Sequence, residues 1–128
     1  MQYEYFYGAQ AEQFSFYRIP KALFTEPNFR ELSTDAKVLY GILLDRMSLS
    51  LKNQWLDAQN KVYIIFTVEE IMDALNCANQ KATRLMVELE KQAGLIERKR
   101  QGLGRPNLIY VKNFAATIND KCCEKGDS

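Results

Sequence analysis

The fold is decided by residues 67–94, whose sequence is TVEEIMDALNCANQKATRLMVELEKQAG. Thr67 can cap a helix whose third residue, Glu70, reaches back to the cap, which is the pattern of a capping box. Apolar residues recur at helical spacing on both sides of a short turn. Asn79 can cap the second helix, and Gly94 supplies the left-handed residue that ends it. This stretch therefore predicts two helices joined by a short turn.

The following residues, 95–111, have the sequence LIERKRQGLGRPNLIYV. Two runs typical of strands, 95–100 and 108–111, flank a glycine-rich loop at 101–107, which predicts a β-hairpin. A helix pair followed by a basic, twisted hairpin is the winged helix-turn-helix arrangement. We therefore expect an α+β fold with three main helices and a small β-sheet that ends in a C-terminal wing hairpin.

The segments before residue 67 supply the rest of this fold. A helix is expected from a cap at Ser33 or Thr34 to Met47, because its apolar residues form a broad helical stripe. Residues 48–60 are polar and predict a loop. Residues 62–66 are β-branched and aromatic, and predict a strand.

The domain organisation follows from length and pattern. The chain has 128 residues, enough for a single core without disulfides or metal. We expect an aromatic N-terminal arm at 1–13 that is either flexible or packs on another surface. A second subunit is favoured over DNA bases, because a duplex hides its base faces. A winged-helix domain is expected at 14–114, and a flexible tail or the start of a linker at 115–128.

The composition argues against several classes of function. The chain contains no histidine, the commonest general base and metal ligand, and its three cysteines lack paired CxxC spacing. We therefore expect no enzyme, no metal and no cofactor. No apolar run is long enough to span a bilayer, no secretory signal is present, and the cysteine pattern is no disulfide framework. These features predict a cytoplasmic protein with no membrane partner.

The distribution of charge points to a polyanion. The whole chain has a net charge of +1, but residues 79–112 contain eight basic and three acidic residues. A solvated, lysine-rich surface would give the same count, so charge alone leaves both interpretations open.

Candidate DNA-contacting residues lie on the second helix of the pair and on the hairpin. The helix presents a polar face opposite its apolar stripe, and an ordinary solvated face is the alternative. Its candidates are Asn79, Gln80, Lys81, Thr83, Arg84 and Lys91. Glu88 and Glu90, further along, would repel phosphates. The hairpin candidates for phosphate binding are Arg98, Lys99, Arg100, Arg105 and Asn107. Cations on an edge strand also prevent aggregation, which is the competing explanation.

Several segments together resemble the N-terminal domain of RepA plasmid replication initiators from Firmicutes. They include FYRIPKALF at 16–24, LSTDAKVLYGILLDR at 32–46, KNQW at 52–55 and VYI at 62–64. The resemblance implies a winged-helix fold, a homodimer, and sequence-specific binding to double-stranded DNA repeats at the replication origin of a plasmid or integrative element. It also implies host replication proteins as partners of a separate C-terminal domain. Because the sequence stops at Ser128, we expect either a fragment of a longer initiator or a short relative with another role.

Two other functions are compatible with the same sequence. A transcriptional repressor of this fold would bind an operator instead of an origin. A winged helix can also serve as a protein-interaction module. Strong dependence of binding on salt would favour either DNA-binding role over protein interaction.

Overall fold

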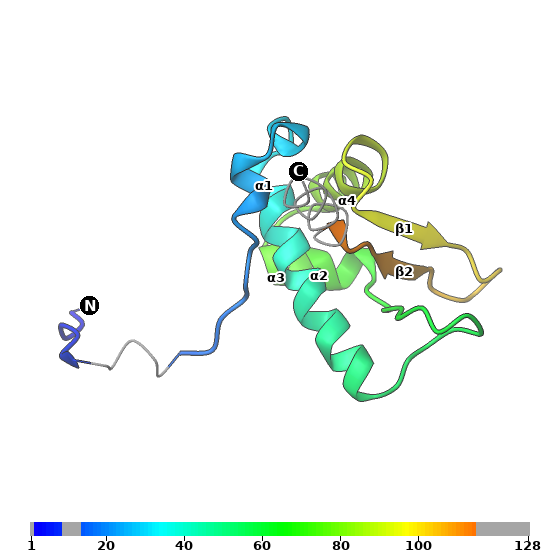
Figure 1. Cartoon of the computed structure of the whole chain (residues 1–128), viewed down its shortest axis with the longest axis horizontal. Coiled ribbons are helices and arrows are strands. Elements are labelled where there is room, and N and C mark those ends of the chain that lie inside the picture. Colours follow the sequence, from blue (N-terminus) through cyan, green and yellow to red (C-terminus); the bar gives the residue numbers. More distant parts are fainter. Residues whose placement is uncertain (1, 9–13, 115–128) are drawn as a thin grey trace, which may run out of the picture.

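Helices make up most of the fold, and a two-stranded antiparallel hairpin projects from one side of them (Figure 1). The computed structural model describes residues 2–8 and 14–114. In chain order the elements are α1 (Ala22–Thr25), η2 (Pro27–Phe29), α2 (Thr34–Lys52), α3 (Val68–Leu75), α4 (Asn79–Val87), η3 (Glu88–Gln92), β1 (Ile96–Lys99) and β2 (Leu108–Val111). The expected α+β winged-helix arrangement is confirmed.

Helix α2 is the longest element and begins at a side-chain cap. The hydroxyl of Ser33 accepts a hydrogen bond from the backbone N–H of Ala36 at 3.2 Å, as the sequence predicts. The helix continues to Lys52, so the predicted loop from residue 48 is wrong at its start. Ser48 donates its hydroxyl to the Leu44 carbonyl and Ser50 is buried, so both serines fit within the helix.

The helix pair α3–α4 forms as predicted, with one correction at the second cap. Thr67 and Glu70 form a capping box in which each side chain accepts from the other's backbone N–H. Asn76 adopts the left-handed conformation that ends α3. Ala78, and not Asn79, is the N-cap of α4, because Ala78 is extended and its carbonyl accepts the first helical hydrogen bond.

The end of α4 widens into η3, a π-helical turn. The N–H of Ala93 donates to the carbonyl of Glu88 at 3.0 Å, a bond that spans five residues. Gly94 then takes a φ of 67°, which confirms the expected helix end. Hydrophobic periodicity did not indicate the widened turn.

The hairpin pairs β1 with β2 in a register that joins Ile96 to Val111 and Lys99 to Leu108. The strand expected at residues 62–66 is reduced to two isolated bridges, one between Val62 and Leu56 and one between Ile64 and Ile109, the second with two hydrogen bonds of 2.9 Å. Pairing stops there because the chain turns at Thr67 into the cap of α3.

The core lies where α2, α3, α4 and the hairpin meet. Its largest fully buried apolar side chains are Leu23, Leu39, Leu43, Ile64, Ile71, Leu85, Met86, Leu89, Leu95, Ile96 and Ile109. Each such side chain contributes about 1.5–3 kcal/mol when it is removed from water. Tyr40 joins this core, and its hydroxyl donates to the Lys112 carbonyl at 2.9 Å. Burial raises the pKa of Tyr40 to about 12, so the phenol stays protonated as a donor.

The segment before α1 is fixed to α2 at Gly41. A Cβ at Gly41 would lie 3.0 Å from the Arg18 carbonyl oxygen and 2.9 Å from a side-chain carbon of Ile19. This close approach explains a glycine in the middle of a helix, where it costs roughly 1 kcal/mol relative to alanine. The predicted arm is described only at residues 2–8. Its residues 1 and 9–13, and the predicted tail at 115–128, lie outside the described residues.

The buried carboxylate of Glu88 connects the end of α4 to the start of α2. Glu88 in η3 accepts hydrogen bonds from both the N–H and the hydroxyl of Ser33, each at 2.9 Å. The bonds hold the start of α2 against the end of α4. The Ser33 hydroxyl thus accepts the capping hydrogen bond from the Ala36 N–H and donates a hydrogen bond to the Glu88 carboxylate.

Replacing Glu88 with alanine is expected to lower the free energy of unfolding by about 1–3 kcal/mol, because two donors of Ser33 lose their acceptor. Urea denaturation of the purified variants measures this change. Glu88→Gln should cost less, since its amide can still accept one bond and donate to the hydroxyl. Glu31→Ala, at an exposed site, is the control; an equal loss there would contradict the prediction.

Candidate nucleic-acid interface

Helix α4 presents a polar face because its apolar face is fully used by the core. Ala82, Leu85 and Met86 are buried against α2 and α3. The candidates on the opposite side are exposed: Asn79, Gln80, Thr83 and Arg84, with Lys91 one turn beyond in η3. Within the described residues the Arg84 guanidinium forms no ion pair. The face is therefore open to an external partner.

Lys81 does not belong to this open face. Its ammonium lies 2.7 Å from the carboxylate of Asp35, in the first turn of α2. The pair is half-exposed, so its net stabilisation is small. Its geometric effect is to direct Lys81 toward α2, away from Gln80 and Arg84. The sequence placed Lys81 among the candidate DNA-contacting residues, because position on a helix alone does not indicate an ion-pair partner.

The two acidic residues that sequence analysis placed against phosphate binding both have partners within the fold. Glu88 is buried against Ser33. The carboxylate of Glu90 accepts from the Nε of Arg98 at 2.9 Å and from the Arg98 backbone N–H at 3.2 Å, and it lies 2.7 Å from a second guanidinium nitrogen. The charge of Glu90 is therefore compensated by Arg98, and the Glu88 carboxylate is turned to Ser33.

The Glu90–Arg98 pair also connects the end of the helix to the first strand of the wing. Burial opposes ionisation of Glu90, but the hydrogen bonds and charge of Arg98 outweigh it and lower the pKa of this carboxyl. Both side chains are about a quarter exposed. Arg98 therefore holds the wing against η3, and its charge is already compensated within the fold.

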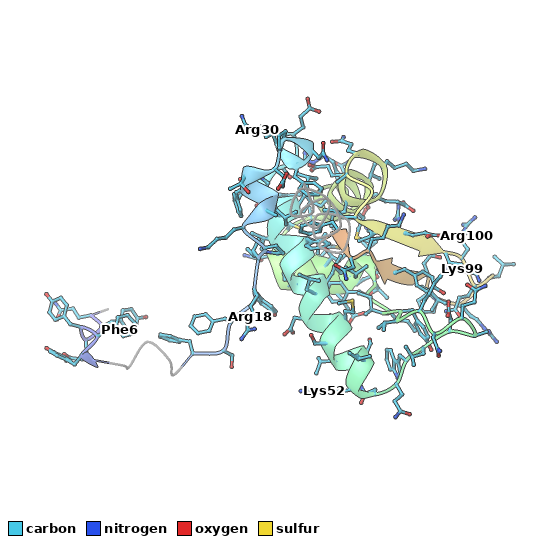
Figure 2. The ribbon with its side chains drawn as sticks, viewed as in Figure 1. Phe6, Arg18, Arg30, Lys52, Lys99 and Arg100 are labelled. Carbon is cyan, nitrogen blue, oxygen red and sulfur yellow. The ribbon has the colours of Figure 1, made fainter. Side chains whose placement is uncertain are left out.

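The remaining wing candidates gather at the outer end of the hairpin. Lys99 and Arg100 extend from the end of β1 (Figure 2), and Arg105 and Asn107 are exposed in the loop that follows. No ion pair compensates Lys99, Arg100 or Arg105 within the part of the chain that the structure describes. Three cations thus remain available at the far end of the wing.

A second loop, within the predicted loop at 48–60, supports the wing through a contact that the sequence did not indicate. The hydroxyl of Tyr110, in β2, donates to the Asp57 carboxylate at 3.0 Å. The other carboxylate oxygen of Asp57 accepts from the backbone N–H groups of Lys61 and Gln59, at 2.9 and 2.8 Å. These bonds lower the pKa of Asp57, the Lys61 N–H most strongly. Asp57 followed by such a turn is an Asx-turn signal that the sequence did contain.

Trp55 belongs to this same loop. Its indole stacks on the ring of Tyr63 with centroids 6.1 Å apart and ring planes 19° apart. The backbone N–H of Tyr63 donates to the Trp55 carbonyl at 3.2 Å. The loop is therefore a second, irregular hairpin that lies beside the wing (Figure 1).

Together these features define a class of protein. A helix with an exposed polar face, preceded by a capped helix and followed by a cationic hairpin, is the winged helix-turn-helix architecture. Such domains expose the second helix of the pair and the wing as one continuous surface.

The family follows from comparison with known sequences. The chain belongs to the family described as "Replication initiator protein A (RepA) N-terminus", whose model matches residues 15–124. A curated relative, "41 kDa protein" from Lactobacillus helveticus, is 32% identical over 103 residues, or 80% of this chain. The chain spans only 28% of that relative's length.

Solved structures agree with this assignment. One described as "N-Terminal domain of DNA binding protein" has a TM-score of 0.72 and 39% identity, covering 88% of this chain and 85% of that one. "Structure of Rep-DNA complex" has a TM-score of 0.71 and 39% identity, covering 86% and 84%. "Structure of MDR initiator" has a TM-score of 0.68 and 40% identity, covering 86% of each chain.

Residues 2–8 and 14–114 contain neither a candidate metal centre nor a membrane-spanning helix. Among them no group of three or more His, Cys, Asp or Glu side chains is placed to hold a metal ion. No helix in these ranges has the length and apolar character needed to cross a bilayer.

The lowered pKa of Glu90 leads to a pH-dependent prediction. A carboxyl whose pKa is lower in the folded state stabilises the fold above its unfolded pKa, and this stability is lost as the pH falls through the folded pKa. Glu90→Gln should therefore be less stable than the wild type at about pH 7, and the difference should shrink toward about pH 3. Urea midpoints at both pH values test this. A constant difference would show that the charge of Glu90 is not the cause.

Proposed function

We propose that this chain binds double-stranded DNA sequence-specifically at the replication origin of a plasmid or mobile element, as the DNA-binding part of a replication initiator. The observation that carries the proposal is the open polar face of α4 beside a wing with three uncompensated cations. Family membership and the likeness to a Rep–DNA complex support it. The role is one of binding and not of catalysis.

In this proposal α4 enters the major groove. Arg84 can pair bidentately with guanine, Asn79 and Gln80 with adenine, and Thr83 can contact a thymine methyl. These four residues occupy the N-terminal half of the helix, the part that meets base edges in helix-turn-helix proteins. Lys91 lies further along and contacts the backbone. Lys81 retains its ion pair with Asp35 and orients α4 against α2.

The wing contributes affinity more than specificity. Lys99, Arg100 and Arg105 bind phosphates that flank the site, and Asn107 donates to the same backbone. In this proposal Arg98 is mainly a positioning residue, whereas the sequence indicated a phosphate-binding role. It positions the hairpin through Glu90 and contributes less charge to the DNA.

The aromatic arm and the greater length of the curated relative extend the proposal to partners. Tyr5 is 81% exposed and Phe6 60% exposed, and the Phe6 ring packs edge-on against Phe14 at 5.9 Å. Such an aromatic arm suits packing against a second copy of the chain, which would place a homodimer on repeated sites in the cytoplasm. Host replication proteins would bind a C-terminal domain, in the additional length that the curated relative has.

Fluorescence anisotropy tests the proposed function. Labelled duplexes that tile the gene and its flanking DNA are titrated with the full chain at two salt concentrations, with a random duplex as control. Tight, salt-sensitive binding to a repeated segment is expected, with a slope of about −0.9 in log K against log salt for each phosphate neutralised. A single site at a promoter would favour a repressor. No preference over random DNA would favour a protein-interaction module.

Substitutions separate base contacts from backbone contacts. Arg84→Ala should cost roughly 1–3 kcal/mol on the specific duplex and relax specificity at one base pair. Arg100→Ala should weaken all duplexes alike and reduce the salt slope by about 1. The control is Arg18→Ala, since Arg18 lies on the other side of α2 from the wing (Figure 2). Equal losses on specific and random DNA for Arg84→Ala would contradict its assignment.

The arm has its own test. A chain that lacks residues 1–13 is expected to sediment as a monomer at concentrations where the whole chain is a dimer. Analytical ultracentrifugation without DNA measures this. A truncated chain that still dimerises would exclude the arm from the interface, and a whole chain that is monomeric would contradict the dimer itself.

A further inference from the structure

The tip of the wing is a tight turn that holds one leucine outward. The N–H of Arg105 donates to the Gly102 carbonyl at 3.3 Å, and Gly104 has a φ of 78°. A positive φ at the third position defines a type II turn and favours glycine there. Leu103 therefore occupies the outer corner. Below it, the Gln101 side-chain amide donates to the Pro106 carbonyl at 2.8 Å and closes the base of the loop.

Leu103 is fully exposed and has cationic neighbours. Its relative exposure is 105%, the highest of the large apolar side chains that the structure describes. Lys99, Arg100 and Arg105 are exposed in the same hairpin end and form no ion pair with described residues. A protein-docking surface would need a contiguous apolar patch. Around Leu103 the loop offers glycines, polar groups and cations instead.

This combination has a known physical use on DNA. Proteins that bind the minor groove hold its backbone with Arg and Lys, and insert an apolar side chain between base pairs, which unstacks one step and bends the duplex. The slender backbone at Gly102 and Gly104 suits such an approach, because neither residue carries a side chain that would strike the groove walls.

We infer that Leu103 inserts into the minor groove beside the site bound by α4, and that the chain thereby bends its DNA and partly unstacks one base-pair step. The inference rests on the proposed function and adds a DNA-deforming activity to it. Lys99, Arg100 and Arg105 hold the phosphates on either side of the inserted leucine. The deformed step would be a flexible pyrimidine–purine step, because these cost least to kink.

The test uses the full chain and the tightest-binding duplex from the tiling set. The duplex carries 2-aminopurine at successive steps to report unstacking, and a donor and acceptor at its ends to report bending. At saturation the wild type should raise the 2-aminopurine fluorescence at one step and shorten the end-to-end distance. Leu103→Ala should abolish both changes while raising Kd by less than about tenfold, a loss of under 1.4 kcal/mol. Leu103→Met should retain them.

Leu51→Ala removes another exposed leucine, on α2, and serves as the matched control. Wild-type protein that binds without deforming the duplex would overturn the inference and leave the proposed function intact. Deformation unchanged in Leu103→Ala would also overturn it, and an accompanying change in sedimentation would assign Leu103 to a protein contact. No binding of the wild type to any duplex would overturn the proposed function and this inference together.

Discussion

The arrangement of the helices depends on one buried carboxylate. Glu88 accepts two hydrogen bonds from Ser33, and Ser33 also caps α2, so one small cluster fixes where the longest helix starts and where the α4 helix ends. A buried carboxyl group is costly unless its oxygens find hydrogen-bond donors, and Ser33 supplies two. The π-helical turn at η3 begins at this same residue. The helix that carries the exposed face of α4 is thus held in place by an interaction at its C-terminal end.

The polar residues around α4 form two groups, one with partners inside the fold and one that is exposed. Lys81, Glu88 and Glu90 are engaged with Asp35, Ser33 and Arg98, and hold α4 against α2 and against the wing. The side chains of Gln80 and Arg84 make no ion pair or hydrogen bond within the described ranges. A groove-binding helix needs side chains that are free to contact DNA, next to side chains that hold the helix in place. The same helix therefore both supports the fold and offers a surface.

The features that local chemistry determines can be predicted from the sequence. The capping box at Thr67 and Glu70, the helix end at Gly94 and the hairpin all follow from residues close together in the chain. The pairings Ser33–Glu88 and Asp57–Tyr110 join residues 55 and 53 positions apart, and no charge count indicates such partners. The sequence therefore predicted a loop where the second hairpin around Trp55 lies. The Glu90–Arg98 pair is only eight positions apart, but a charge count does not indicate it either, and contact of Arg98 with phosphate stays a prediction.

The separation between engaged and open side chains on α4 has an evolutionary consequence. Exposed substitutions that break no contact usually change stability by less than about 0.5 kcal/mol. Positions such as Gln80 and Arg84 can therefore be exchanged while the scaffold folds unchanged. Under the proposed function, a descendant of this chain could acquire specificity for a new origin sequence through a few substitutions on the exposed face of α4. Two plasmids or mobile elements in one cell could then diverge until neither initiator recognises the other's origin DNA.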